Sequence, residues 1–205
     1  IIRENNIDVA IFAEFENTDF PFIIQEHLGE FILHNGNGGC PKITMIAKRD
    51  YQIEVRREST RYVLYSVLYD AQTYNIVGIH LPSNPRAKPQ DRKIVIRSLV
   101  CDIEEQEMQL NHDNTIVIGD FNASPFDGEL VEKDAFNAVL FKHLIMRRER
   151  VTHQNHIYKR FYNPMMSCIS ENDSSYGSFY FSNPVDTLYW FCYDQVLVRK
   201  ALVDS

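Results

Sequence analysis

The chain has 205 residues, and its 28 Asp and Glu residues outnumber its 21 Lys and Arg residues, which gives a formal net charge of −7. Hydrophobic residues make up 44% of the chain and charged residues 24%, a composition that excludes disordered, collagen-like and low-complexity proteins. No apolar run approaches the roughly 18–20 residues of a membrane span, and the N-terminus lacks the features of a signal peptide.

The four cysteines are far apart in the sequence and form no C-x-x-C pair. This spacing argues against a zinc site and against a disulfide scaffold. Together with the missing signal peptide, it predicts free thiols in a reducing compartment and a cytoplasmic protein. These cysteines are Cys40, Cys101, Cys168 and Cys192.

The N-terminal half of the chain is rich in strand signals. Residues 8–14 form a short apolar run closed by Glu14, which predicts a buried strand, and residues 20–28 predict a short helix after a proline. Four β-rich runs then follow a glycine-rich turn, which predicts a meander and excludes simple alternation of strands and helices. The runs cover residues 42–47, 52–56, 61–69 and 74–80.

The C-terminal half begins with an amphipathic helix. Apolar residues at 96, 99, 100 and 103 recur with helical spacing, and the predicted helix ends near Asn111. Residues 115–122 predict a buried strand, residues 128–142 a helix, and residues 188–198 the last strand, with little regular structure from 143 to about 183. No repeat or linker interrupts the chain. We therefore expect a single α/β domain over residues 1–205, with two packed sheets flanked by helices.

Polar side chains terminate or interrupt these apolar strands. An unpaired carboxylate in a core would cost several kcal/mol, since even a neutral polar group costs on the order of 2–7 kcal/mol. Something must therefore compensate such residues. The positions are Glu14, His80, Asp120, Asn122 and Asp194.

The pair Asp120 and Asn122 suits chemistry on a phosphate ester. Residues two apart in an extended chain point to the same side, so the carboxylate can hold or activate a water while the amide donates to a phosphoryl oxygen. Glu14 with Asp120 or Asp194 suits Mg²⁺, which takes one or two carboxylates and the substrate phosphate as ligands. The metal would withdraw charge from the phosphate and position the attacking water.

Four segments resemble, in order and in approximate spacing, the endonuclease/exonuclease/phosphatase superfamily, which includes pancreatic-type deoxyribonucleases and abasic-site endonucleases. The tetrapeptide Gly-Asp-Phe-Asn after an apolar run is the most specific of these motifs. The match spans nearly the whole chain. The segments are IDVAIFAE at 7–14, VGIHLPS at 77–83, IVIGDFN at 116–122 and YDQVLV at 193–198.

The resemblance implies a four-layered α/β sandwich with two mixed central β-sheets and a metal-dependent site at one end. By position, Glu14 resembles the Mg²⁺ ligand, with Mn²⁺ as the other metal considered. Asp120 is similar to the water-activating carboxylate, which also contributes to the metal site, and Asn122 to the residue that positions phosphate and water. His80 matches the phosphate-contacting histidine of the deoxyribonuclease branch, and Asp194 resembles the carboxylate that orients a catalytic histidine.

Two parts of the family pattern are not found in the sequence. The family opens with a strand that ends in an Asn of the metal site, and it closes with a Ser-Asp-His motif that supplies the catalytic histidine. We interpret the chain as a domain that lacks its first strand and its C-terminal Ser-Asp-His segment. The 205 residues by themselves are therefore expected to be inactive.

The resemblance implies a Mg²⁺-dependent phosphodiesterase, with nucleic acid as the first choice of substrate. A phosphatase or phosphodiesterase acting on a phosphoinositide or another small phosphorylated molecule is the second hypothesis. A catalytically inactive binding module of the same fold is the third. The oligomeric state is left open.

Each candidate residue also has a purely structural interpretation. Glu14 could cap a helix or lie on the surface, and His80 could be a hydrogen-bonded structural histidine. Asp120 and Asn122 could form an Asx turn, and Asp194 could be a buried, ion-paired acid. Two further clusters stay open in the same way. The aromatic residues at 179–181 and 189–191 could stack on bases or fill the core, and the basic residues at 147–150 and 159–160 could flank a phosphate or be solvated.

Overall fold

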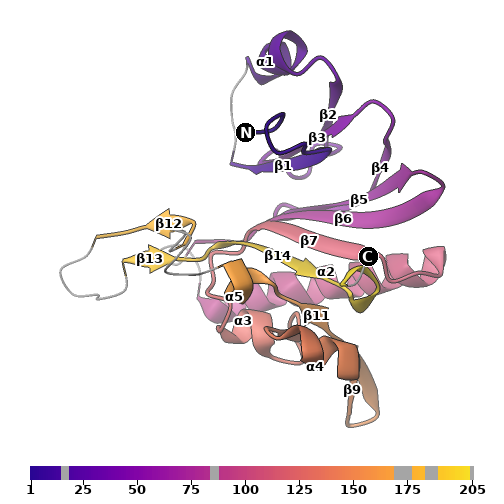
Figure 1. Cartoon of the computed structure of the whole chain (residues 1–205). Coiled ribbons are helices and arrows are strands. Elements are labelled where there is room, and N and C mark those ends of the chain that lie inside the picture. The colour runs from indigo at the N-terminus through magenta and orange to yellow at the C-terminus, as the bar shows by residue number, and fades with distance from the viewer. Residues whose placement is uncertain (15–18, 84–87, 169–176, 183–188, 204–205) are drawn as a thin grey trace.

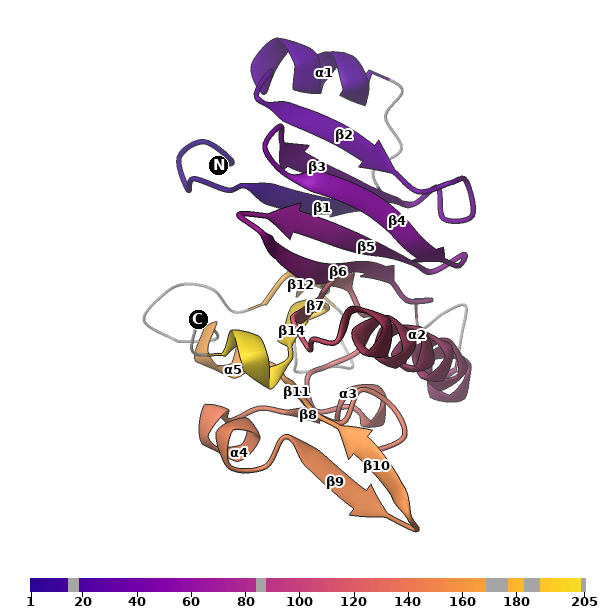
Figure 2. The same cartoon turned by 90° about the vertical axis from the view of Figure 1, so that its right-hand side faces the viewer.

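The computed structural model describes residues 1–14, 19–83, 88–168, 177–182 and 189–203. Two β-sheets stack on each other, with helix α1 (Phe20–His27) outside the smaller sheet and helix α2 (Pro89–Leu110) outside the larger one (Figure 1). Figure 2 shows the same succession of layers from the side. The predicted four-layered α/β sandwich is confirmed.

The smaller sheet has the strand order β1-β3-β2, and both of its pairs are antiparallel. Ala13, the last residue of β1, pairs with Ile43, the first residue of β3, so the end of one strand meets the start of the other. The strand predicted at 8–14 and the helix predicted at 20–28 are both present. The strands are β1 (Val9–Ala13), β2 (Phe31–Asn35) and β3 (Ile43–Lys48).

The larger sheet is mixed and has the order β4-β5-β6-β7-β14-β11-β8. Strands β4, β5 and β6 form an antiparallel meander, β6 and β7 are parallel across the α2 crossover, and β14 runs antiparallel to β7. Its strands are β4 (Gln52–Glu58), β5 (Tyr62–Tyr69), β6 (Gln72–His80), β7 (Thr115–Asp120), β8 (Ala138–Val139), β11 (Phe161–Tyr162) and β14 (Asp194–Val198).

The first of the four runs predicted as a meander belongs to the other sheet. Residues 43–47 of β3 are all buried, so this strand needs cover on both of its faces. A central position in the smaller sheet, between α1 and the larger sheet, provides that cover. The three later runs do form the predicted meander.

Alternate residues of the central strands face opposite layers, as the two-residue repeat of a strand requires. Ile43 and Met45 pack against Val63 and Tyr65 between the two sheets, whereas Ile46 faces α1. The other face of the large sheet packs against α2. That cluster includes Leu64, Val77, Ile79, Ile96, Leu99, Ile103, Val117, Phe121 and Leu197.

The region after β7 differs most from the sequence-based expectation. The helix predicted at 128–142 is wrong, because Asn137 adopts a left-handed φ of +51° and Phe136 turns into the core. Short elements replace it, and a hairpin forms where little structure was predicted. They are α3 (Gly128–Val131), α4 (Lys142–Arg147), β9 (Arg150–His153), β10 (His156–Lys159) and α5 (Met165–Cys168).

The final strand predicted at 188–198 consists of two strands, and Leu188 lies outside the described residues. Strand β13 (Trp190–Phe191) pairs with β12 (Phe179–Tyr180) in a separate hairpin, whereas β14 joins the large sheet. A short 3₁₀ helix, η1 (Lys200–Leu202), follows β14. In the described part of the chain, every helix is too short or too polar to cross a membrane.

Candidate active site

Three of the predicted residues form one row across the large sheet. The parallel β6–β7 pair places His80 beside Asp120, and the antiparallel β7–β14 pair places Asp194 opposite Asp120. Residues paired in this way project from the same face of a sheet. Gly119 permits the close approach of β6 and β7, because it has φ +142° and an added Cβ would lie 2.1 Å from the carbonyl oxygen of Ile79.

The Asp120 carboxylate is oriented by the residue two positions later. The backbone N–H of Asn122 donates to Asp120 Oδ1 at 2.8 Å, and its Nδ2 donates to Asp120 Oδ2 at 2.8 Å. Nδ2 also donates to the carbonyl oxygen of Leu81 at 2.9 Å. The Asx turn considered as a structural alternative is therefore present, and it holds the carboxylate in place. Both amide protons of Asn122 are engaged, so donation to a phosphate would require one of them to change partner.

Glu14 reaches the same place from the smaller sheet. It follows the end of β1 with a left-handed φ of +58°, and its backbone N–H donates to the carbonyl oxygen of Lys42 at 2.8 Å. Its Oε1 lies 2.6 Å from Lys42 Nζ and 3.3 Å from His80 Nε2. His80 Nε2 is also 3.8 Å from Asp120 Oδ2. The site is thus assembled from residues at the strand ends of both sheets.

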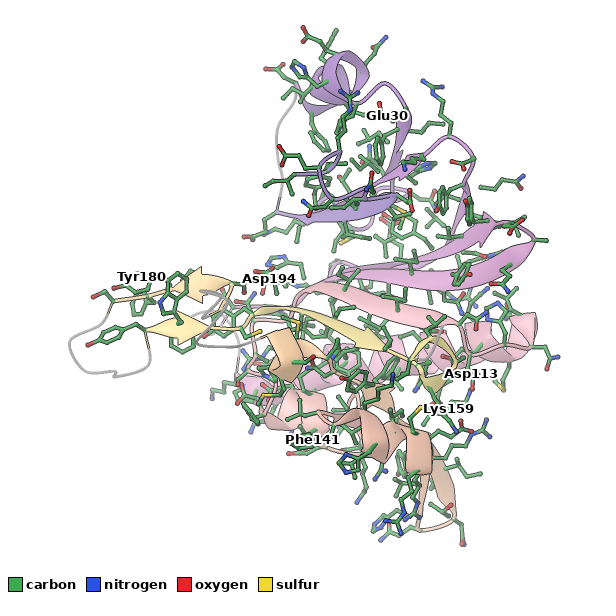
Figure 3. All side chains as sticks on the ribbon, in the orientation of Figure 1. Glu30, Asp113, Phe141, Lys159, Tyr180 and Asp194 are labelled. Atoms are coloured by element: carbon green, nitrogen blue, oxygen red, sulfur yellow. The ribbon has the colours of Figure 1, made fainter. Side chains whose placement is uncertain are left out.

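These residues line one cleft of about 840 Å³. Lys42 and Arg61 bring positive charge to it, and Figure 3 shows Asp194 where β14 meets the projecting β12–β13 hairpin. The described residues that line the cleft are Glu14, Lys42, Arg61, His80, Pro82, Ser83, Asp120, Asn122, Ser178, Phe179, Phe181, Phe191, Tyr193 and Asp194.

Burial changes the protonation of the two central groups. It raises the pKa of Asp120 to about 6, and the negative charges of Asp194 and Glu14 add to this rise against the hydrogen bonds from Asn122. Burial also lowers the pKa of His80, because it outweighs the attraction of Glu14. His80 is therefore neutral near pH 7. With its proton on Nε2 it donates toward Glu14, which leaves the buried Nδ1 without a partner.

The carboxylates fit a hard divalent cation. Glu14 Oε1 and Asp120 Oδ2 lie within 4 Å of the same imidazole nitrogen. The pKa of Asp120 is raised first by burial and then by the negative charges of Asp194 and Glu14, and a bound cation would offset both effects. Among the described residues, no group of three or more His, Cys, Asp or Glu side chains is arranged to hold a metal. A cation here would thus take one or two carboxylates and complete its shell with water and substrate oxygens, as is typical of Mg²⁺.

All five predicted side chains line one cleft. For three of them, the structure tests the purely structural interpretation. Asp194 is exposed, which excludes the buried, ion-paired alternative. Glu14 lies six residues before the first residue of α1 and caps no helix, but it is exposed, as its alternative interpretation as a surface carboxylate predicted. The buried Nδ1 of His80 has no partner, so this histidine is not fully satisfied by the fold.

Sequence reasoning missed two cations of the cleft, Lys42 and Arg61. Lys42 precedes β3 and meets the end of β1, so complementary charges at the matching ends of two antiparallel strands would have been a signal. Arg61 precedes β5, and its carbonyl oxygen accepts the backbone N–H of His80 at 2.9 Å. Only the pairing of β5 with β6 brings this arginine beside the histidine.

No protein-family model and no curated protein sequence matches the chain. Solved structures match it over nearly its whole length. The catalytic domain of human Nocturnin with a bound sulfate anion has a TM-score of 0.60 at 11% identity, covering 97% of this chain and 71% of that chain. TDP2 of D. rerio in complex with a single-strand DNA product has a TM-score of 0.54 at 13% identity, covering 97% and 73%.

The endonuclease domain of TRAS1, a telomere-specific non-LTR retrotransposon, matches with a TM-score of 0.52 at 11% identity, over 99% of this chain and 78% of that chain. TM-scores of 0.52–0.60 establish a shared arrangement of strands and helices, and at identities of 11–13% the likeness shows the fold alone. The chain has the endonuclease/exonuclease/phosphatase fold, as its four motifs predicted.

Proposed function

We propose that this protein is a Mg²⁺-dependent phosphodiesterase that hydrolyses nucleic-acid phosphodiester bonds. The observation that carries the proposal is the row of His80, Asp120 and Asp194 across three strands, with Glu14 facing it from the other sheet. Fold neighbours include an endonuclease domain and a protein solved with a single-strand DNA product, which agrees with a nucleic-acid substrate.

Six side chains of the cleft have roles that their surroundings support. Asp120, held by Asn122, accepts a proton from the attacking water as the water oxygen bonds to phosphorus and the opposite P–O bond breaks. His80 is neutral and donates from Nε2 to a phosphoryl oxygen. Lys42 and Arg61 attract the phosphate. Glu14 and Asp120 would hold Mg²⁺, which supplies charge withdrawal at the phosphate and lowers the pKa of bound water.

The test is hydrolysis by the purified product of the full-length gene. Plasmid DNA, RNA, an abasic oligonucleotide and phosphoinositide vesicles are each incubated with Mg²⁺, with Asp120→Ala as the matched inactive variant. We expect cleavage of a nucleic acid that is lost in Asp120→Ala and in excess EDTA. Cleavage that survives either change overturns the mechanism.

Two results separate the other hypotheses. Selective hydrolysis of phosphoinositides by the wild-type protein favours the small-substrate phosphatase. Binding of nucleic acid without hydrolysis, at every metal tested, identifies an inactive binding module.

A further inference from the structure

The β12–β13 hairpin carries large aromatic side chains that the fold does not bury. It projects from the body of the protein beyond Asp194 (Figure 1, Figure 3). Phe179, Tyr180 and Trp190 remain 46%, 54% and 41% exposed. A two-stranded ribbon has little stability of its own, and a cluster of large apolar side chains left this exposed is typical of a binding surface.

The strand alternation divides these rings between two faces. Phe179 pairs with Phe191, and both line the cleft together with Phe181 and Tyr193. The next pair, Tyr180 with Trp190, projects from the opposite face, and neither residue is among the described lining of the cleft. One face of the hairpin is thus continuous with the candidate active site, and the other is not.

The cleft face is an array of four aromatic rings in mutual contact, in which three contacts are close to parallel and the cross-strand pair Phe179 and Phe191 is tilted by 48°. Phe179 and Phe181 have centroids 6.4 Å apart and an interplanar angle of 11°. Phe179 and Tyr193 are 5.6 Å apart at 23°, and Phe191 and Tyr193 are 5.3 Å apart at 27°. On the outer face, the rings of Tyr180 and Trp190 are tilted by 57°. A planar ligand can extend such a stack where ring surface stays exposed, as it does at Phe179 and Phe181.

Backbone hydrogen bonds anchor the array beside the row of His80, Asp120 and Asp194. Ser178 Oγ accepts the backbone N–H groups of Tyr193 and Asp194 at 3.1 and 2.9 Å. The carbonyl oxygen of Tyr193 accepts the backbone N–H of Phe121, which lies between Asp120 and Asn122. The rings are therefore held at a set position relative to the Asp120 carboxylate.

We propose that the cleft face of this hairpin, formed by Phe179, Phe181, Phe191 and Tyr193, stacks on unpaired nucleobases next to the phosphodiester at Asp120, so that the substrate is single-stranded nucleic acid. The inference rests on the proposed function and adds the strandedness of the substrate. Bases in a duplex are already stacked and offer no free face to these rings. Aromatic rings beside cationic side chains are the usual means of binding single strands.

The chemistry of the cleft favours a base over a lipid chain. Its described lining contains no Val, Leu, Ile or Met, and the residues around the rings are charged or polar. A base can stack on a ring while its phosphate lies among the charged and polar residues of the same cleft, whereas an acyl chain would have to lie against those residues. Across the cleft, Lys42 and Arg61 supply the positive charge that a phosphate backbone requires.

The test is binding, measured in EDTA so that it does not depend on catalysis. Fluorescence anisotropy compares a labelled single-stranded oligonucleotide, its duplex and an abasic strand with the same number of phosphates, each with the full-length protein. Phe179→Ala is the test variant and Trp190→Ala is the matched control from the outer face. Circular dichroism verifies folding, and Phe179→Trp restores a ring if truncation disturbs the hairpin.

We expect Phe179→Ala to weaken binding of the base-containing strand by roughly 5-fold to 100-fold, and Phe179→Trp to retain it. Phe179→Ala should change the affinity for the abasic strand by less than about twofold. Trp190→Ala should change the affinity for the base-containing strand by less than about twofold. The inference is overturned if Phe179→Ala weakens the base-containing and abasic strands equally, or if duplex binds as tightly as single strand. Preferred binding of phosphoinositide vesicles, dependent on Phe179, also overturns it.

The two proposals fail in different ways. If Mg²⁺ produces no cleavage while base-dependent binding persists in wild type and is lost in Phe179→Ala, the catalytic proposal is wrong and the stacking surface stands. If cleavage occurs without any difference between base-containing and abasic strands, the stacking inference is wrong and the phosphodiesterase stands.

Discussion

Asp120 and Asp194 lie directly opposite each other across the antiparallel β7–β14 pair, although 74 positions separate them in the sequence. Two carboxylates on one face of a sheet repel each other, and this repulsion adds to burial in raising the pKa of Asp120 to about 6. The fold thus places the carboxylates of Asp120 and Asp194 close together, although their negative charges repel each other. Such arrangements are common at functional sites and lead to measurable consequences.

The first prediction concerns Asp120 itself. Since its folded-state pKa is raised above the ordinary 3.8, stability should fall as the pH rises from about 4 to about 6 and stay lower above that. In EDTA at about pH 7.5, Asp120→Asn should therefore raise the free energy of unfolding by about 1–2 kcal/mol, after allowance for one hydrogen bond lost to Asn122. Urea titrations of both proteins measure this difference.

Below about pH 3, Asp120 is protonated in both the folded and the unfolded state, so the advantage of Asp120→Asn should disappear. The same substitution should reduce hydrolysis by roughly 10²–10⁴-fold, because Asn cannot accept a proton from water. An advantage that persists unchanged to pH 3.5 would show that charge is not the cause.

The second prediction concerns the metal. Mg²⁺ that binds only the folded protein should stabilise it by about 2.7 kcal/mol at a concentration 100 times its Kd. Glu14→Gln and Asp120→Asn should each remove most of this stabilisation by Mg²⁺, because each replaces a negatively charged oxygen ligand with a neutral amide. Thermal unfolding with and without Mg²⁺ measures the shift. Glu4→Gln, a change at an exposed carboxylate outside the cleft, is the control and should respond like wild type.

The third prediction concerns the alignment of β6 with β7. Gly119→Ala should destabilise the protein by about 2–4 kcal/mol, since the added Cβ would lie 2.1 Å from the carbonyl oxygen of Ile79 at a φ of +142°. Gly29→Ala is the matched control, because its nearest contact is 3.4 Å away. Chemical denaturation of the two variants tests the difference. Equal stabilities would mean that the strands separate at little cost.

The fourth prediction concerns a buried ion-pair network behind the large sheet. Glu107 is fully buried, with Oε1 2.8 Å from Arg199 Nε and Oε2 2.9 Å from Lys159 Nζ. Glu107→Gln should lower the free energy of unfolding by about 3–5 kcal/mol, because it removes the carboxylate that is hydrogen-bonded to the buried Arg199 guanidinium.

Glu105 on the same helix provides the comparison for this network. Its ion pair with Arg57 is half exposed, so Glu105→Gln should cost less than about 1 kcal/mol. Urea unfolding of the two variants measures the contrast. A similar small effect for both would mean that water reaches Arg199 once Glu107 is neutral.

Local sequence signals predicted the elements that carry a strong period. Strand β7 and helix α2 were identified because an apolar run and an i, i+3, i+4, i+7 spacing each reflect burial against the same core. The β9–β10 hairpin was missed because most of its residues are exposed, so no apolar alternation marks it. The prediction of a helix at 128–142 was wrong because Phe136 is buried in the core, and the chain leaves the helical conformation after Val131 to place it there.

The sequence by itself predicted the five polar residues of the candidate site, because a carboxylate, an amide or an imidazole at the end of an apolar strand requires compensation. Only the tertiary structure decided that His80, Asp120 and Asp194 form one row and that Lys42, Arg61 and the aromatic hairpin surround them. The physical reason is strand register. Register depends on which strands pair and on the space between two backbones, as at Gly119, and neither is encoded within a single run of residues.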